Sequence, residues 1–203
     1  MPLFHNGDDL VLFVHVPKCA GTSVKSLLSK KTFKGVNLNN AKDGSHDDKT
    51  GYYQAGTARR MKRAYEEQWK TYFKFAFSRN PWDRMVSCWK NRAAQKYSNF
   101  KDFVYNHQEM IDSGNTSFHW HVMPQCLHVC NDEGDIIVDY IGRFENLQED
   151  INNILELLDL EPSEVPHKNK TSRKNYREYY NKETIRRVED LFWKDIEMFE
   201  YEY

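Results

Sequence analysis

An apolar run that ends abruptly in a loop of small residues most constrains the fold of this chain. Residues 11–16 are almost all β-branched or aromatic, which is typical of a strand buried on both faces. Gly21 follows a short loop, and the spacing of Val24, Leu27 and Leu28 predicts that a helix opens there. A buried strand, a short loop and a helix in succession indicate an α/β fold with a parallel sheet.

The loop between the strand and the helix, residues 15–23, has the composition of an anion-binding site. We call it the lysine loop. It carries the ammonium group of Lys18 and the hydroxyls of Thr22 and Ser23. Free N–H groups and the dipole at a helix start would act on the same anion as Lys18. The loop is not a Walker A motif, because its lysine precedes the glycine instead of following it at the helix start.

A second apolar run, residues 72–78, predicts another strand, and a polar segment follows it directly. This arginine segment, residues 79–87, contains Pro81, which suits the first position of a helix. Asn80 is then the expected N-cap, and Asp83 lies in the first turn. The chain thus repeats the order of strand, polar segment and helix.

Arg79 and Ser87 make the arginine segment a candidate second phosphate site. Arg79 lies at the carboxyl end of the predicted strand, and Ser87 lies about two helical turns further along. A guanidinium fork and a hydroxyl together bind phosphate well. The alternative use of Arg79 is an ion pair with Asp83 at the helix start.

These two segments resemble those of sulfotransferases that use 3′-phosphoadenosine-5′-phosphosulfate (PAPS). The resemblance is to the carbohydrate O-sulfotransferase branch, with the heparan 2-O and chondroitin or dermatan enzymes and their bacterial relatives. It continues in order through residues 119–120, 124–125, 141–147 and 169–172, and then through Tyr176, Tyr179, Tyr180, residues 195–196 and Tyr201. It implies that the lysine loop holds the 5′-phosphosulfate and that Arg79 and Ser87 hold the 3′-phosphate. The loop residues concerned are Pro17, Lys18, Cys19, Ala20, Gly21, Thr22 and Ser23.

The resemblance also implies nucleotide contacts later in the chain. Arg143 and Glu145 follow a third apolar run, residues 136–141, and are expected in the nucleotide pocket. The alternative is an ion pair between them that organises the edge of the core. Lys170 and Ser172 lie in a basic loop, residues 167–174, that resembles the segment folding over the nucleotide in relatives. A solvated charged face is the alternative for this loop.

The implied reaction is an in-line transfer of a sulfuryl group to a hydroxyl, which leaves adenosine 3′,5′-bisphosphate (PAP). Lys18 would neutralise charge on the leaving oxygen, and no metal is required. Related enzymes place a histidine, or in other branches a glutamate, upstream of the second strand as general base. This chain has no histidine in residues 54–59, so His46 and His119 are the catalytic candidates.

The expected architecture is a P-loop-like three-layer α/β fold, with a central, mostly parallel sheet flanked by helices. One domain is expected over residues 1–203, since no linker or internal repeat divides them. A third strand is expected at 136–141, and helices at 59–70, 147–158 and 185–199. Residues 42–51 are rich in turn formers and predict a surface loop.

Composition limits the class of partner. The net charge of −1 gives no global basic field for a nucleic-acid polymer. No run approaches the ~20 apolar residues of a membrane span, and residues 1–10 are too polar for a signal peptide. A cytoplasmic location is therefore expected, or the Golgi lumen if this is a trimmed catalytic domain.

Four cysteines, too few for a disulfide scaffold at this length, complete the candidate groups: Cys19, Cys88, Cys126 and Cys130. The last two resemble a pair found in Golgi relatives, and they would stay reduced in the cytosol. With the nearby histidines they match no standard zinc spacing, so no metal site is expected.

Three functions remain open from the sequence. The first is PAPS-dependent sulfation of a hydroxyl on a carbohydrate or another small acceptor. The second is a P-loop-like nucleotide kinase, and the third is an inactive nucleotide-binding protein that keeps both phosphate segments without a base. Binding of magnesium-ATP would select the kinase, and binding without turnover would select the inactive protein.

Overall fold

The computed structural model describes residues 2–6, 9–30, 34–37, 57–64, 66–90, 97–112, 121–166 and 173–203. The predictions for His46, His119, Lys170, Ser172 and the loop at 42–51 fall outside these residues.

The described strands form one sheet in the order β3-β1-β2-β4-β5. Their bounds are Pro2–Asn6 for β1, Asp9–Val14 for β2, Lys34–Asn37 for β3, Phe73–Ser78 for β4 and Tyr140–Arg143 for β5. β4 pairs in parallel with both β2 and β5, whereas β1 pairs antiparallel with β2 and β3. Every strand except β1 therefore runs in the same direction, and the expected parallel core is confirmed.

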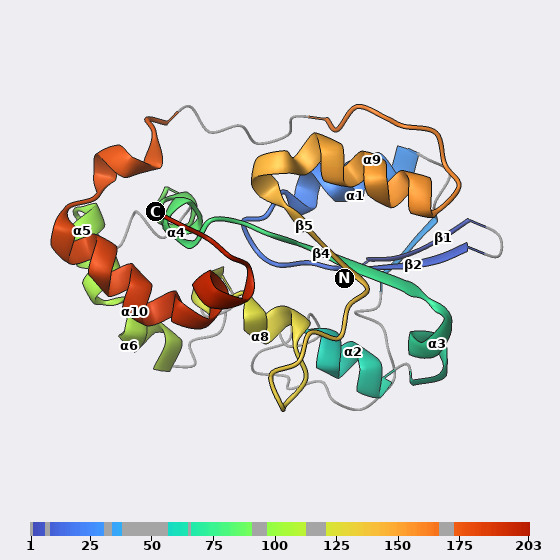
Figure 1. Ribbon diagram of the computed structural model, residues 1–203, viewed down its shortest axis with the longest axis horizontal. Coiled ribbons are helices and arrows are strands. Elements are labelled where there is room, and N and C mark those ends of the chain that lie inside the picture. Colours follow the sequence, from blue (N-terminus) through green and yellow to red (C-terminus); the bar gives the residue numbers. More distant parts are fainter. Residues whose placement is uncertain are drawn as a thin grey trace.

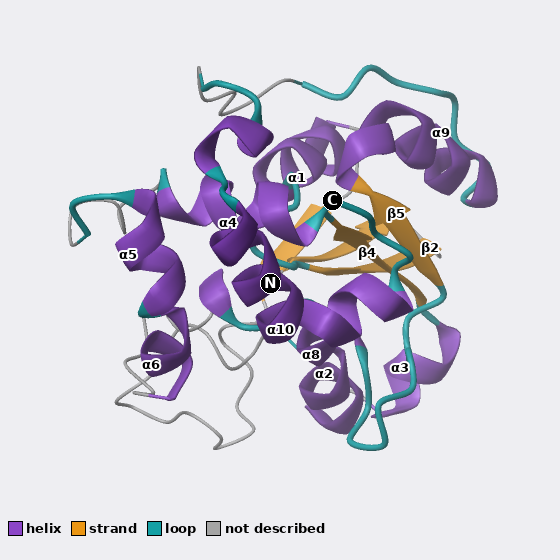
Figure 2. Cartoon of the chain, turned by 60° about the vertical axis from the view of Figure 1, so that its left-hand side comes forward, coloured by secondary structure: helices purple, strands orange, loops and turns teal. Residues whose placement is uncertain are grey.

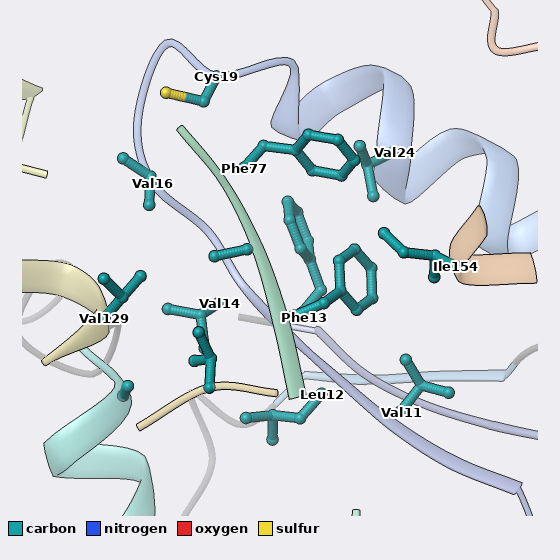
Figure 3. Packing of buried hydrophobic residues seen from close by; sticks show 14 of the residues in the cluster. Val11, Leu12, Phe13, Val14, Val16, Cys19, Val24, Phe77, Val129 and Ile154 are labelled. Carbon is teal, nitrogen blue, oxygen red and sulfur yellow. The ribbon is translucent and has the colours of Figure 1, made fainter. Parts of the chain in front are cut away.

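The central strands are buried because they are apolar on both faces. Phe13, Val14, Phe75 and Ala76 are all fully buried. Alternate residues of a strand point to opposite faces, so Phe13 and Val14 enter different halves of the core. Figure 3 shows Phe13 on the side of Val24 and Val14 on the side of Val129. The continuous apolar run thus fills two layers at once.

Helices cover both faces of the sheet, as the three-layer prediction requires. In Figure 1, α1 (Gly21–Lys30) and α9 (Leu147–Leu157) lie over one face. The other face carries α2 (Ala58–Ala64), α3 (Glu66–Thr71) and the short α8 (Cys126–Val129).

The remaining helices gather beside the sheet around a second apolar cluster (Figure 1 and Figure 2). These are α4 (Pro81–Trp89), α5 (Phe100–Tyr105), α6 (His107–Asp112) and α10 (Lys182–Met198). Two short 3₁₀ turns complete the described elements, η4 (Phe144–Asn146) and η5 (Tyr176–Tyr179). α4 joins the two parts, because it begins directly after the sheet strand β4.

Three details differ from the sequence prediction. The third strand covers residues 140–143 instead of 136–141, because Ile136 forms an isolated antiparallel bridge with Cys130 and is 43% exposed. Two helices, α2 and α3, replace the single helix expected at 59–70. The strands β1 and β3 were not predicted. In the described part of the chain, no helix is both long and apolar enough to cross a membrane.

Candidate functional site

Both predicted phosphate segments start at the same edge of the sheet. β2 leads into the lysine loop and β4 into the arginine segment, and Val14 is paired with Ala76 near the carboxyl ends of these neighbouring strands. In open α/β sheets, ligands bind beyond the carboxyl ends of the strands. The parallel pairing therefore places the two segments side by side at the usual ligand edge.

The lysine loop has an unusual backbone. Lys18 has φ 70° and Ala20 has φ 58°, both in the left-handed region that residues with a Cβ rarely adopt. The carbonyl oxygen of Ala20 then accepts hydrogen bonds from Ser23 N (2.9 Å) and Val24 N (3.1 Å), which starts α1. Strained conformations of this kind gather at ligand-binding sites.

Gly21 is required at the start of α1 for reasons of space. A Cβ at this position would lie well inside van der Waals contact of Cδ2 and Nε2 of His15. The histidine ring thus packs directly against the first turn of the helix. Burial, with a further effect of the Lys25 charge, lowers the pKa of His15 to about 3, so the ring is neutral at pH 7.

The ammonium group of Lys18 lies close enough to two arginines to feel their charges. Its side chain is partly buried, and burial lowers its pKa. The guanidinium groups of Arg79 and Arg84 act in the same direction. A bound anion would stabilise the charged form of a lysine in these surroundings.

The local prediction for the arginine segment is confirmed. Oδ1 of Asn80 accepts hydrogen bonds from the N–H groups of Trp82 (3.1 Å) and Asp83 (3.3 Å), and Pro81 is the first residue of α4. This cap fixes the direction in which α4 leaves the sheet.

Arg79 and Asp83 form the ion pair that the sequence offered as an alternative. Nε and Nη2 of Arg79 donate to Oδ2 of Asp83 at 2.8 and 2.6 Å. Arg173 donates to the other carboxylate oxygen of Asp83, while its own Nη1 is buried and has no hydrogen-bond partner among the residues that the structure describes. The Arg79 guanidinium also lies over the Phe144 ring, 3.8 Å from its centroid. One carboxylate thus holds two guanidinium groups, which leaves a net positive charge.

Arg84 ties the arginine segment to the lysine loop. Its side chain is almost fully buried, and Nε donates to the carbonyl oxygen of Pro17 at 3.0 Å. Nη2 donates to the carbonyl oxygens of His121 (3.2 Å) and Met123 (3.0 Å). The left-handed turn at Lys18 is therefore held from outside the loop.

The C-terminal residues support the other side of the arginine segment. The hydroxyl of Tyr201 lies 3.0 Å from Ser78 Oγ and donates to Glu145 Oε2 at 3.2 Å. Oε1 of the same glutamate accepts from Asn80 N at 2.8 Å. This chain of contacts fixes the backbone on both sides of Arg79.

Arg143 also contacts the C-terminal residues. Its Nη2 donates to the carbonyl oxygen of Phe199 at 2.6 Å, and its guanidinium lies 5.0 Å from the centroid of the Tyr201 ring. Arg143 and Glu145 thus each hold the C-terminal segment, and the described residues contain no ion pair between them. Their proposed nucleotide contacts stay predictions.

Of the other predicted groups, Ser87 lies partly buried on α4. The four cysteines are free thiols. Across the described ranges, no three histidine, cysteine or carboxylate side chains gather as metal ligands.

Two residues of the site, Arg84 and Arg173, have no predicted role from the sequence. Arg84 lies inside the predicted arginine segment. Its position on the buried face of an amphipathic helix is the sequence pattern that could have indicated a structural role. Arg173 belongs to the predicted basic loop at 167–174, but its partner Asp83 is 90 residues away in the chain. Only the fold brings these two residues together.

Comparison with known proteins agrees with this geometry. A family model described as "Sulfotransferase family" matches residues 1–202. Carbohydrate sulfotransferase 11 of Mus musculus is 27% identical over an alignment of 122 residues, and the match covers 43% of this chain and 33% of that protein. The protein of the same name from Rattus norvegicus gives the same identity and coverage. The match thus spans about a third of the length of these relatives, and no solved structure matches the chain.

Proposed function

The chain belongs to the sulfotransferase family, and from this premise we propose that it transfers a sulfuryl group from PAPS to a hydroxyl of a carbohydrate. PAP is the expected product. The single observation that carries the proposal is the direct contact of the two phosphate segments, in which Arg79 Nη1 donates to the carbonyl oxygen of Lys18 at 2.8 Å. A carbohydrate acceptor is supported by the names of the two relatives.

The charges around these segments fit a donor with several phosphate oxygens. The cationic side chains here are Lys18, Arg79, Arg84 and Arg173, against the carboxylates of Asp83, Glu145 and Asp195. Within the described ranges the buried Nη1 of Arg173 has no hydrogen-bond partner, so it can donate to an anion. The residues present therefore fit a polyanionic nucleotide.

In this proposal the lysine loop binds the 5′-phosphosulfate. Lys18 and the hydroxyls of Thr22 and Ser23 stabilise the charge that develops on the bridging phosphate oxygen. The bond from sulfur to that oxygen breaks, and a bond from sulfur to the acceptor oxygen forms. The acceptor hydroxyl gives its proton to the general base, for which His46 and His119 remain the candidates.

The nucleotide end is assigned to the arginine segment. Arg79 and Ser87 bind the 3′-phosphate, with Arg143, Lys170 and Ser172 as further contacts. Arg79 keeps its contacts to Asp83 and to the Lys18 carbonyl oxygen in this role, because they use three of the five N–H groups of its guanidinium and leave two for the phosphate. A single domain over residues 1–203 and a cytoplasmic location stay predictions.

Isothermal titration with PAP, 5′-AMP and ATP, with and without magnesium, tests the donor. We expect PAP to bind without metal and to bind more tightly than 5′-AMP. Ser87→Ala should weaken PAP binding with little effect on the fold, and Arg79→Ala should weaken it more strongly. Arg186→Ala, which removes an exposed arginine of α10, is the matched control and should bind as the wild type does. Tighter binding of magnesium-ATP would instead favour a kinase.

Transfer of radiolabelled sulfate from PAPS to a panel of carbohydrates tests the reaction. Incorporation that depends on Lys18 supports the proposed activity. PAP binding with no transfer to any hydroxylated acceptor would favour an inactive nucleotide-binding protein. His46→Ala and His119→Ala, assayed on the accepted carbohydrate, then identify the base.

A further inference from the structure

Gln125, directly before α8, is fully buried and binds the peptide backbone of Arg79 on both sides. Its Oε1 accepts from Arg79 N at 2.9 Å, and its Nε2 donates to the carbonyl oxygen of Arg79 at 2.8 Å. The two backbone groups fix which end of the amide is oxygen, because an N–H can only donate and a carbonyl can only accept. The backbone at Arg79 is thus paired with a side chain instead of a neighbouring strand.

The same side chain contacts the lysine loop. Sγ of Cys19 donates to Oε1 of Gln125 at 3.3 Å. Burial raises the pKa of the Cys19 thiol to about 12, so the thiol keeps the proton that it donates. A single carbonyl oxygen of Gln125 therefore receives one donor from each of the two phosphate segments.

Gln125 is in turn fixed by α10. Oδ2 of Asp195 accepts from Gln125 N at 2.7 Å, and Oδ1 accepts from Cys126 N at 2.8 Å. Asp195 is itself fully buried. Backbone and side chain of Gln125 are both held, so the side chain has little freedom to follow a movement of either segment.

We propose that Gln125 is a positioning residue that sets the spacing between the lysine loop and the arginine segment, so that both phosphate groups of PAP bind at once. The inference rests on the proposed function. Two anchor points help each other only when their separation matches that of the ligand groups. Gln125 touches neither phosphate in this scheme and acts only through Arg79 and Cys19.

Glutamine suits this position because it offers an acceptor and a donor in one plane. Methionine has a similar length and volume but offers neither strong group. Glutamate keeps the acceptor, and it can donate to the Arg79 carbonyl only when it is protonated. These two substitutions therefore remove the link in different ways.

The test compares the affinities of PAP, 5′-AMP and 3′-AMP for the wild type and for Gln125→Met. In the wild type, PAP should bind far more tightly than either monophosphate. In Gln125→Met this advantage should fall at least tenfold, while the affinities of the monophosphates change a few-fold at most. A merely structural role would weaken all three ligands in parallel, and that result, or an unchanged advantage, overturns the proposal.

Gln148→Leu is the matched control. Gln148 also bridges two backbone groups, from Nε2 to Ser163 O at 2.9 Å and from Val165 N to Oε1 at 2.9 Å, but it lies on α9. This variant should keep the full advantage of PAP. If the wild type itself binds PAP no more tightly than the monophosphates, the proposed function fails as well. The wild-type titration alone thus separates a failure of the proposed function from a failure of the proposal for Gln125.

Gln125→Glu provides a second test if the methionine variant does not fold. Measured relative to the wild type at the same pH, its advantage for PAP should recover as the pH is lowered, since the protonated carboxyl can donate to Arg79. A relative advantage that does not change with pH overturns the proposal.

Discussion

The guanidinium of Arg79 donates from Nη1 to the carbonyl oxygen of Lys18, and these two residues lie in the segments that follow the neighbouring parallel strands β4 and β2. The contact holds Lys18 in a left-handed backbone conformation that its side chain disfavours. A change in either residue should therefore affect both phosphate segments.

Replacement of Lys18 should separate its chemical role from its backbone strain. Lys18→Gly and Lys18→Ala should both lower kcat by about 10²- to 10³-fold, as expected for the loss of one group that stabilises the leaving oxygen. Lys18→Gly should be about 1 kcal/mol more stable than Lys18→Ala, because glycine adopts φ 70° without strain. Denaturant unfolding and sulfate transfer measure the two effects. Equal stabilities would show that the left-handed turn carries no strain.

Loss of Asp83 should destabilise the protein. Asp83→Ala leaves Arg79 and Arg173 without their common carboxylate in a mostly buried place, which should cost about 3 kcal/mol of unfolding free energy. Glu183→Gln removes one partner of the exposed Lys101 ion pair and should change the unfolding free energy far less than Asp83→Ala does. Urea unfolding of both variants compares them. Similar losses of unfolding free energy in the two variants would contradict the prediction that Asp83 stabilises the fold through its two arginine partners.

Gly21 and His15 should show strong coupling. Gly21→Ala should destabilise the protein by about 1–3 kcal/mol, because the new methyl group overlaps the His15 ring. His15→Ala should relieve that overlap, so the double variant should be more stable than additivity of the two changes allows. A double-mutant cycle in denaturant measures the coupling, and simple additivity would exclude the steric account.

Acid should destabilise the fold through its buried histidines. Burial lowers the pKa of His107 to about 3, against an ordinary value of 6.5. Between these values the unfolded chain binds a proton that the native ring does not, so stability falls as the pH is lowered from about 6.5 toward 3. His107→Gln should reduce that slope by at most about 1.4 kcal/mol per pH unit. Unfolding free energies measured from pH 4 to 7 test this, and an unchanged slope would contradict it.

The local structure of both phosphate segments could be predicted from the sequence. The apolar runs before Lys18 and Arg79 extend over whole strands, and such runs leave few alternatives to a buried parallel strand. The cap of α4 at Asn80 depends only on the three residues that follow it. Patterns of this kind are complete within a few neighbouring residues.

The features that could not be predicted from the sequence depend on contacts between residues that are distant in the chain. The exposed bridge at Ile136 has the same β-branched composition as a buried strand, so composition could not tell them apart. Gln125 and Arg173 have no local pattern that marks their contacts to Arg79 and Asp83. A glutamine before a short helix is unremarkable until its partner's backbone is known.

The contacts of Gln125 also have a consequence for the order in which the protein is made. Gln125 is 46 residues from Arg79, and Asp195 is 70 residues further along. A chain leaving the ribosome therefore exposes both cationic segments well before Gln125 and Asp195 are synthesised. Long loops must close before such contacts form, so the site should be among the last parts to assemble. A nascent chain that has released β4 but not yet Gln125 and α10 would carry both segments without the contacts that fix the backbone of Arg79.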